Sequence, residues 1–322
     1  MSLPSVQAPR FVVMIRPHHF HPNPETEQDN AFQTPQVGEA DKAIEKLAYQ
    51  EVSHARDMLE KEGVYVHLFE DETYKTPDSV FPNNWFSTHA GGHVALYPMF
   101  SSNRQLERRP DIIEMLKRTY RIQDVIDYSG LEQDGLALEG TGAMVLDHIG
   151  RIAYAARSNR CNEIALERFC THFNYEPIVF DAADQNKRLI YHTNVMMCVG
   201  TEFALVVLQT ITNPSRRAEV VQRLEENGRT VIDLSFDQMS EFAANALELQ
   251  GKDGLVLALS SRALRALRPD QVAVMERSAK LLPLNVPTIE LAGGSVRCML
   301  AGIHLTRRPL SAQLAAREVM NA

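Results

Sequence analysis

The sequence has few cysteines, no long apolar run and no cluster of basic residues. Its four cysteines are scattered over 322 residues and form no CxxC pair, so neither a disulfide framework nor a zinc site is predicted. No apolar run reaches the roughly 18 residues of a membrane span, and the N-terminus lacks the apolar segment of a secretory signal. The formal net charge of -8 and the absence of a Lys/Arg stripe argue against a nucleic-acid partner. The sequence therefore predicts a cytoplasmic chain with reduced thiols.

The chain is instead rich in short apolar segments, and hydrophobic residues make up 44% of it. Amphipathic helices are expected to begin near Glu39, Arg109, Arg160, Asn213 and Pro269. The fourth helix has clear end signals, because Asn213 and Pro214 suit its start and Gly228 follows its end. Strands, richest in Val, Ile, Leu and Tyr, are expected at 11–16, 64–70, 93–98, 124–129, 151–157, 176–180, 194–200, 203–210, 230–234, 254–259 and 287–291.

This rhythm supplies more strands than a doubly wound sheet needs, since that fold alternates strand and helix one for one. It predicts an α/β fold of five ββαβ units closed in a ring, that is, a five-bladed α/β propeller with pseudo-fivefold symmetry. No long linker or low-complexity tract interrupts the pattern. Residues 1–322 are therefore expected to form a single domain.

Polar side chains gather at four of the expected strand ends. In a ring, strand ends from different units converge on the axis, so groups far apart in sequence would meet there. The four segments are TPDSVFPNNWFSTH (76–89), LEGTGAMVLD (138–147), YHTNVMMCVG (191–200) and GGSVRCML (293–300). Together they supply a thiol, an imidazole, a carboxylate and several amides, which are the side chains of nucleophilic catalysis by cysteine.

These segments resemble the guanidino-group-modifying superfamily of arginine deiminases, dimethylarginine hydrolases and amidinotransferases, all built as five-bladed α/β propellers. The resemblance extends from MIRPHHFHPNPET to GGSVRCMLAG, over nearly the whole chain. FPNNWFSTH, LEGTG and HTNVMM look most similar to a bacterial branch of arginine-deiminase-related proteins, for which citrulline hydrolysis is the implied activity. The histidines of HHFH (18–21) lack an acidic or cysteine companion at ligand spacing, so no metal is expected. LEGTG lacks the Walker lysine and the Rossmann spacing, so no nucleotide cofactor is expected either.

The resemblance implies three catalytic residues. Cys298 corresponds to the nucleophile that follows the Gly-Gly turn, although cysteine is so often buried that a core position is the alternative interpretation. His192 corresponds to the histidine that moves protons, and an imidazole can stabilise a thiolate and later activate water. Glu139 corresponds to the acidic residue beside it. Whether Glu139 orients the imidazole or holds substrate N–H groups is left open.

The resemblance also implies contacts with a small amino-acid substrate. Arg160, in RSNRCN, is expected to grip the substrate carboxylate with its planar fork, and Asp78 to hold the α-amino group. Asn23 lies in a loop, residues 18–33, that resembles the family's lid. Asn84 and Asn194 stand where dimethylarginine hydrolases and arginine deiminases, respectively, carry acidic residues.

Those two amides favour a neutral substrate. A guanidinium offers only N–H donors and pairs with carboxylates, whereas a ureido group is neutral and has a carbonyl oxygen to which an amide can donate. The prediction is a cysteine-dependent hydrolase that converts citrulline to ornithine, ammonia and carbon dioxide. A dimethylarginine or arginine hydrolase, an amidinotransferase and, more distantly, a non-catalytic ribosome-binding propeller are the alternatives. The oligomeric state is left open.

Overall fold

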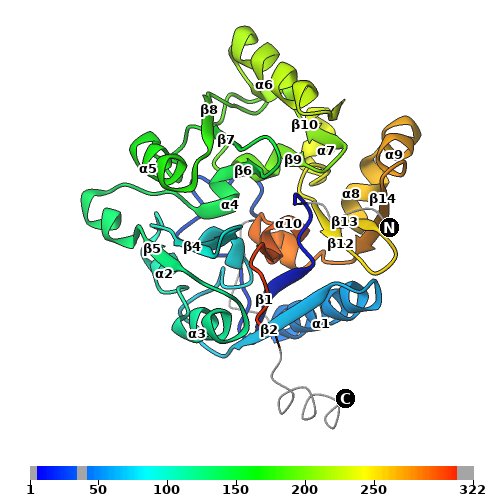
Figure 1. Ribbon diagram of the computed structural model, residues 1–322. Helices are drawn as coiled ribbons and strands as arrows, with labels where there is room; N and C mark the ends of the chain where they lie inside the picture. The colour runs from blue at the N-terminus through cyan, green and yellow to red at the C-terminus, as the bar shows by residue number, and fades with distance from the viewer. Residues whose placement is uncertain (1–5, 35–41, 310–322) are drawn as a thin grey trace.

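Five three-stranded sheets surround a central axis in the computed structural model, which describes residues 6–34 and 42–309 (Figure 1). In each sheet the middle strand runs antiparallel to one neighbour and parallel to the other. A helical connection joins the two parallel strands, and these helices form the outer ring in Figure 1. The predicted five-bladed α/β propeller is confirmed.

Each blade follows the ββαβ pattern. The first contains β15 (Ala301–Ile303), β1 (Phe11–Pro17), α1 (Lys42–Lys61) and β2 (Tyr65–Asp71); the second β3 (Phe86–His89), β4 (His93–Leu96), α2 (Ser102–Gln105), α3 (Pro110–Thr119) and β5 (Asp124–Asp127). The third contains β6 (Met144–Asp147), β7 (Ile152–Ala156), α5 (Glu163–Phe173) and β8 (Glu176–Phe180); the fourth β9 (Met197–Val199), β10 (Phe203–Val206), α6 (Pro214–Glu226) and β11 (Thr230–Asp233). The fifth contains β12 (Leu247–Gln250), β13 (Leu255–Ser260), α8 (Ser261–Ala266), α9 (Pro269–Met275) and β14 (Ala279–Leu284), after α7 (Phe236–Ser240).

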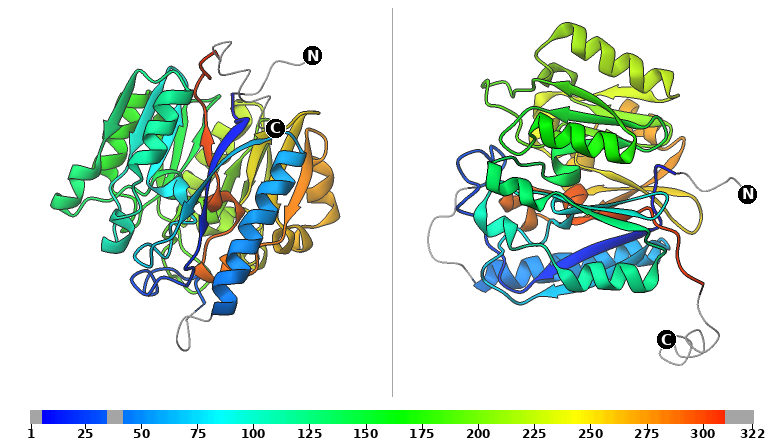
Figure 2. Two further views of the ribbon diagram at one scale, coloured as in Figure 1. Left: turned by 90° about the horizontal axis from the view of Figure 1, so that it is seen from below. Right: turned by 60° about the vertical axis from the view of Figure 1, so that its left-hand side comes forward.

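The ring closes through the first blade, where strands from the two ends of the chain pair. β15 lies antiparallel to β1, with Phe11 opposite Ile303 and Val13 opposite Ala301 (Figure 2, left). Val12 and Val13 are fully buried, and burying a side chain of this size contributes roughly 1.5 to 3 kcal/mol. The contacts that close the propeller are therefore among the longest-range contacts in the chain.

The signals at the helix ends act as expected in α6. The Asn213 side chain accepts hydrogen bonds from the backbone N–H groups of Ser215 and Arg216, Pro214 occupies the first turn, and Gly228 has a positive φ of 82°. The helix expected near Arg160 begins three residues later, at Glu163, because the Asn162 side chain caps it. The predicted start of the first helix, Glu39, lies outside the described residues.

Several segments differ from the prediction: β3, β6, β12, β14 and β15 were not among the expected strands, and two segments ahead of β15 were expected as strands but form turns. Residues 287–291 were expected to form a strand, but Ile289–Ala292 form a 3₁₀ turn, η5. Cys298 was expected at the head of a strand, but it lies in a single helical turn, α10 (Val296–Met299), just before β15. A short apolar run does not distinguish strand from helix by its own pattern. Similar turns precede three other inner strands: η1 (Pro82–Asn84), α4 (Gly140–Ala143) and η3 (Thr193–Val195).

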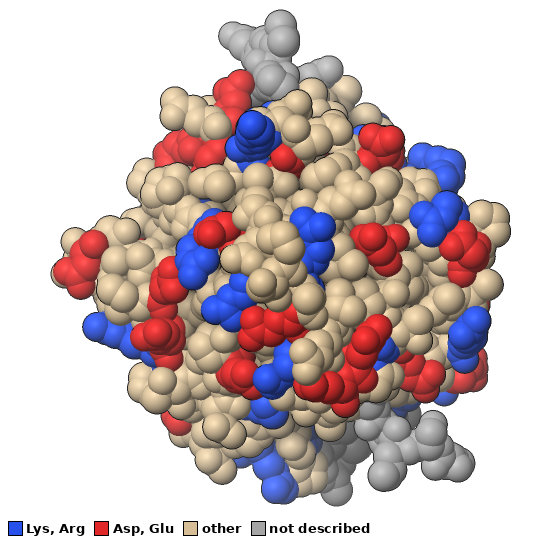
Figure 3. Space-filling view, turned by 90° about the horizontal axis from the view of Figure 1, so that it is seen from above, with Lys and Arg blue, Asp and Glu red and all other residues tan. Residues whose placement is uncertain are grey.

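Within residues 6–34 and 42–309, no helix combines the length and apolar character needed to span a bilayer. On the face shown in Figure 3, acidic and basic side chains are intermixed. That face carries no stripe of one charge.

Candidate active site

All eight predicted site residues lie close together near the propeller axis, some in the short turns before the inner strands and others, such as Asn23 and Arg160, in loops. Five of them line one small pocket: Asp78, Asn84, Arg160, His192 and Cys298. The other three each contact one of these five, since Glu139 bonds to His192, Asn194 to Cys298 and Asn23 to Asp78. Residues more than 200 positions apart in the sequence thus share one site, as expected for blades that form a closed ring.

His192 and Glu139 form a buried pair. His192 Nε2 lies 2.8 Å from Glu139 Oε2, and the carboxylate oxygen can only accept, so the proton resides on Nε2 and leaves Nδ1 unprotonated. Burial lowers the pKa of His192 to about 4, although Glu139 opposes that shift. Burial would raise the pKa of Glu139, but the guanidinium groups of Arg160 and Arg104 outweigh it and lower that pKa below its usual range. The pair is therefore a neutral imidazole oriented by an ionised carboxylate.

Two side-chain amides point at the sulfur of Cys298. Asn194 Nδ2 lies 3.3 Å from Sγ, and Asn245 Nδ2 lies 3.4 Å from it. The sulfur is almost fully buried, with 4% of the residue exposed. Donors at these positions stabilise a thiolate more than a thiol, because a hydrogen bond to a charged acceptor is stronger than one to a neutral acceptor.

Asn245 was missed by the sequence analysis. It is fully buried, and it also donates to the backbone oxygen of Asn194 at 3.1 Å and accepts from the backbone N–H of Arg297 at 3.1 Å. It precedes β12, the inner strand of the fifth blade, which was not among the expected strands. The fivefold repeat could have pointed to Asn245. Polar residues were predicted at the start of an inner strand in four blades, so a polar residue was to be expected at the equivalent position of the fifth.

Arg104 connects several carboxylates at one side of the pocket. Its guanidinium pairs with Glu107 at 2.8 Å and with Glu139 at 3.2 Å, and it lies 3.7 Å from Asp78. Burial raises the pKa of Glu107 to about 7 even though Arg104 opposes the shift, and burial likewise raises the pKa of Asp78. When the Asn84 amide is turned with its oxygen toward Arg104, that oxygen lies 2.9 Å from Nη2.

The predicted lid, residues 18–33, contacts the site through two of its residues: Asp29 binds Arg160, and Asn23 binds Asp78. Arg160, with 1% of the residue exposed, directs its fork at the carboxylate of Asp29 in the 18–33 loop. Asn23 donates to Asp78 at 2.8 Å and exchanges hydrogen bonds with Asn103. The loop therefore packs onto the two residues that were expected to hold the substrate's carboxylate and amino groups.

Glycines allow the close approach of these groups. A Cβ on Gly142 would lie 2.2 Å from the Asn84 amide and 2.8 Å from His192 Nδ1. Gly293, with a φ of 79°, turns the chain ahead of Cys298, and a Cβ there would lie 2.4 Å from Asn30. The expected Gly-Gly turn before the cysteine is present in the structure.

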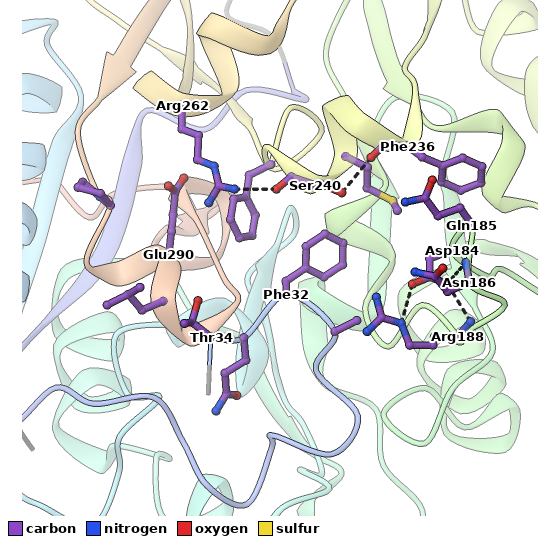
Figure 4. A pocket seen from close by; sticks show the side chains of 16 residues that line it. Phe32, Thr34, Asp184, Gln185, Asn186, Arg188, Phe236, Ser240, Arg262 and Glu290 are labelled. Atoms are coloured by element: carbon purple, nitrogen blue, oxygen red, sulfur yellow. Dashed lines mark hydrogen bonds and ion pairs between the residues drawn. The ribbon is translucent and has the colours of Figure 1, made fainter. Parts of the chain in front are cut away.

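The pocket at Cys298 is small. Its volume is about 20 Å³, close to that of one water molecule, so an amino acid cannot enter it without a movement of the surrounding chain. Asn30, from the 18–33 loop, lines it and donates to the backbone oxygen of Ala292 at 3.0 Å. The following loop residues line a separate cavity of about 360 Å³, in which Phe32 lies between Arg262 and Arg188 (Figure 4).

The histidines of the HHFH segment contact nearby side chains. His18 lies 2.9 Å from Glu70, and His19 lies 3.3 Å from Glu45 and stacks on Tyr74. Across the described part of the chain, no group of three or more His, Cys, Asp or Glu side chains has the arrangement of a metal site. These histidines therefore join the loop to α1 and β2.

The fold, with a thiol, an imidazole and a carboxylate gathered on its axis, is that of the guanidino-group-modifying superfamily. A comparison with family models narrows this class: residues 16–305 match the model for N,N dimethylarginine dimethylhydrolase, eukaryotic. The chain belongs to this family and is a hydrolase that acts on guanidino C–N bonds. The match supports the dimethylarginine or arginine hydrolase alternative better than the citrulline-hydrolysing branch, so citrulline stays a prediction.

Solved structures show the same fold at low sequence identity. The substrate-bound N-terminal domain of ArgZ, an arginine dihydrolase from the ornithine-ammonia cycle in cyanobacteria, is 17% identical, with a TM-score of 0.69 over 91% of this chain and 97% of that one. Unliganded AgrE is 16% identical, with a TM-score of 0.72 over 93% of this chain and 40% of that one. DDAH from Pseudomonas aeruginosa, complexed with citrulline, is 14% identical, with a TM-score of 0.59 over 94% and 100%. No curated protein matched the sequence.

Proposed function

We propose that the chain hydrolyses a C–N bond at the central carbon of a terminal ureido or guanidino group, with Cys298 as the nucleophile and citrulline as the preferred substrate. The catalytic part of the proposal is supported by the neutral His192, oriented by Glu139, in the same pocket as the Cys298 thiol. Such an imidazole can accept the proton of a thiol or of water. Residues 1–322 are proposed to act as one catalytic domain.

With citrulline, the reaction takes two steps. Cys298 Sγ loses its proton to His192 Nδ1 and bonds to the ureido carbon, the bond from that carbon to the terminal nitrogen breaks, and ammonia leaves with the proton from His192. Water then loses a proton to His192 and attacks the same carbon, and the C–S bond breaks as the thiol regains a proton. The released carbamate gives carbon dioxide and ornithine, so one citrulline and one water yield ornithine, ammonia and carbon dioxide.

The preference for a neutral substrate rests on the charge around the reacting group. Positions 84 and 194, in or against the pocket, carry amides. The Asp78 carboxylate, which lines the pocket, is assigned to the α-amino group, and the charge of Glu139 is already offset by Arg104 at 3.2 Å and Arg160 at 3.5 Å. A guanidinium would gain little from this arrangement, because carboxylates supply most of its binding energy. A ureido oxygen could accept from an amide N–H.

A methylated arginine or arginine is the second candidate substrate. The family match favours it, and ArgZ, a structure with the same fold, is described as an arginine dihydrolase. In this case Glu139 would pair with the guanidinium, and the first product would be citrulline with an amine or ammonia. The chemistry at Cys298 would be unchanged.

A substrate panel distinguishes the two candidates. Purified protein is given citrulline, arginine, monomethylarginine or dimethylarginine, and ornithine, citrulline, ammonia and dimethylamine are measured. We expect ornithine and ammonia from citrulline, a loss of at least about 10⁴-fold in kcat for Cys298→Ala, and no comparable loss for Cys170→Ala. Dimethylamine or citrulline as the main product would reject the citrulline preference. Transfer to an added amine such as glycine would identify an amidinotransferase.

Two further results complete the test. Asn84→Asp should raise turnover of guanidino substrates relative to citrulline by about tenfold, because it adds a carboxylate to the pocket. If no substrate turns over and a thiol reagent labels all four cysteines equally slowly, the proposed catalysis is wrong and the non-catalytic propeller becomes the better interpretation. A large loss of stability in Cys298→Ala would instead favour a core role for this cysteine.

A further inference from the structure

A second cavity lies farther along the propeller axis than the Cys298 pocket. The inner strands begin beside that pocket, and side chains from β3, β6, β9, β12 and β15 line this cavity, whose volume is about 40 Å³. It has room for about three water-sized spheres, which is too little for an amino acid. No Asp or Glu of the described residues lines it.

Arg297, the residue before Cys298, directs a cationic group into this cavity. Nη1 donates to the backbone oxygen of Leu300 at 3.1 Å, and among the described residues no other acceptor and no carboxylate partner lies within bonding distance of its guanidinium. Arg297 is only partly buried, but arginine does not give up its proton, so a guanidinium that lines this cavity favours a counter-charge there. Arg229 shows the usual arrangement, since its guanidinium is held by Asp147 at 2.7 and 2.8 Å.

The other polar groups at the cavity do not supply that charge. His148 and His304 stack at 3.9 Å, and burial lowers the pKa of both, so they are neutral. Burial raises the pKa of the Cys198 thiol to about 12, so it is also neutral at physiological pH. The remaining wall is mixed. It contains neutral polar residues such as Ser87 and Thr88 and apolar residues such as Leu146 and Val199.

We propose that this cavity binds a small monovalent inorganic anion of halide size against the guanidinium of Arg297. The size of the cavity, its cationic donor and its lack of carboxylates all favour a small anion over a phosphate or an amino acid. The site is distinct from the Cys298 pocket and does not depend on which substrate the enzyme hydrolyses.

Crystals of the full chain soaked in sodium bromide provide a direct test. We expect an anomalous peak in the cavity within about 3.5 Å of the Arg297 guanidinium and none at Arg229, which already has Asp147. Bromide peaks at the molecular surface show that the soak reached the protein. Surface peaks without a peak at Arg297 would overturn the proposal.

A solution test covers the case in which crystals alter the ion content. Chloride, compared with gluconate at equal ionic strength, should raise the Tm of the wild type by roughly 2 °C, because gluconate is too large for the cavity and binding stabilises the folded state. The difference should vanish in Arg297→Gln and persist in Arg157→Gln, a surface arginine that pairs with Glu163. Equal Tm values of the wild type in the two salts would overturn the proposal even if Arg297→Gln fails to fold.

Discussion

The carboxylate of Asp29 occupies the fork of Arg160, with Asp29 Oδ2 3.1 Å from Arg160 Nε. Asp29 belongs to the 18–33 loop, whose Asn30 lines the pocket, and Arg160 is the residue expected to hold the substrate carboxylate. If Arg160 binds the substrate carboxylate as predicted, that carboxylate has to displace the carboxylate of Asp29. Asp29 and the substrate then compete for one guanidinium.

Asp29→Asn should lower KM for the amino-acid substrate by about tenfold with kcat changed less than about threefold. The neutral amide competes weakly for Arg160, and one charged hydrogen bond corresponds to roughly this factor. Steady-state kinetics of the variant measure both constants. Glu27→Gln, which changes an exposed charge of the same loop, is the matched control and should leave KM unchanged. A higher KM in Asp29→Asn would show that Asp29 assists binding.

Gly142→Ala should fold but lose at least about 100-fold in kcat. The added Cβ would lie 2.2 Å from the Asn84 amide and 2.8 Å from His192 Nδ1, so both groups must shift, and small misplacements of reacting groups have effects of about this size. Gly130→Ala is the control, because nothing lies within 4 Å of a Cβ at that position. Equal kcat values for the two variants would mean that His192 can move without loss.

Asn245→Asp should slow the alkylation of Cys298 by iodoacetamide at pH 7 by about tenfold. The change keeps an oxygen for the Arg297 N–H but replaces the donor 3.4 Å from Sγ with a carboxylate oxygen, which disfavours the thiolate. The rate is followed by mass spectrometry over a pH series. Asn227→Asp, at the end of α6, serves as the control. An unchanged rate profile in Asn245→Asp would limit Asn245 to a structural role.

The acid limb of kcat/KM should lie near pH 4 and not near 6.5. Burial lowers the pKa of His192 to about 4, so the neutral base persists well below the range of an ordinary imidazole. The same shift contributes stability that is fully present above pH 6.5 and is lost as the pH falls toward 4, because only the unfolded chain binds the proton there. Circular dichroism at each pH separates inactivation from unfolding. A limb near 6.5 in folded protein would contradict the assignment of His192.

Local sequence patterns determined the elements of this protein and the identity of most of its site. Asn213 and Pro214 begin α6 because the Asn213 cap and the proline both act within the first turn of the helix. Most of the predicted apolar segments form strands, and these strands pair with one another in the five sheets. Cys298, His192 and Glu139 could be named because each lies in a distinctive short motif. The family match now covers these positions as well.

The tertiary structure decided what depends on contacts between distant segments. Residues 289–292 and Cys298 lie in helical turns because a segment of four residues is compatible with either conformation until its surroundings are fixed. Asn245 reaches Sγ, and Asp29 reaches Arg160, only because the closed ring brings five blades to one axis. No local pattern encodes those distances, since they follow from the pairing of β15 with β1 at opposite ends of the chain.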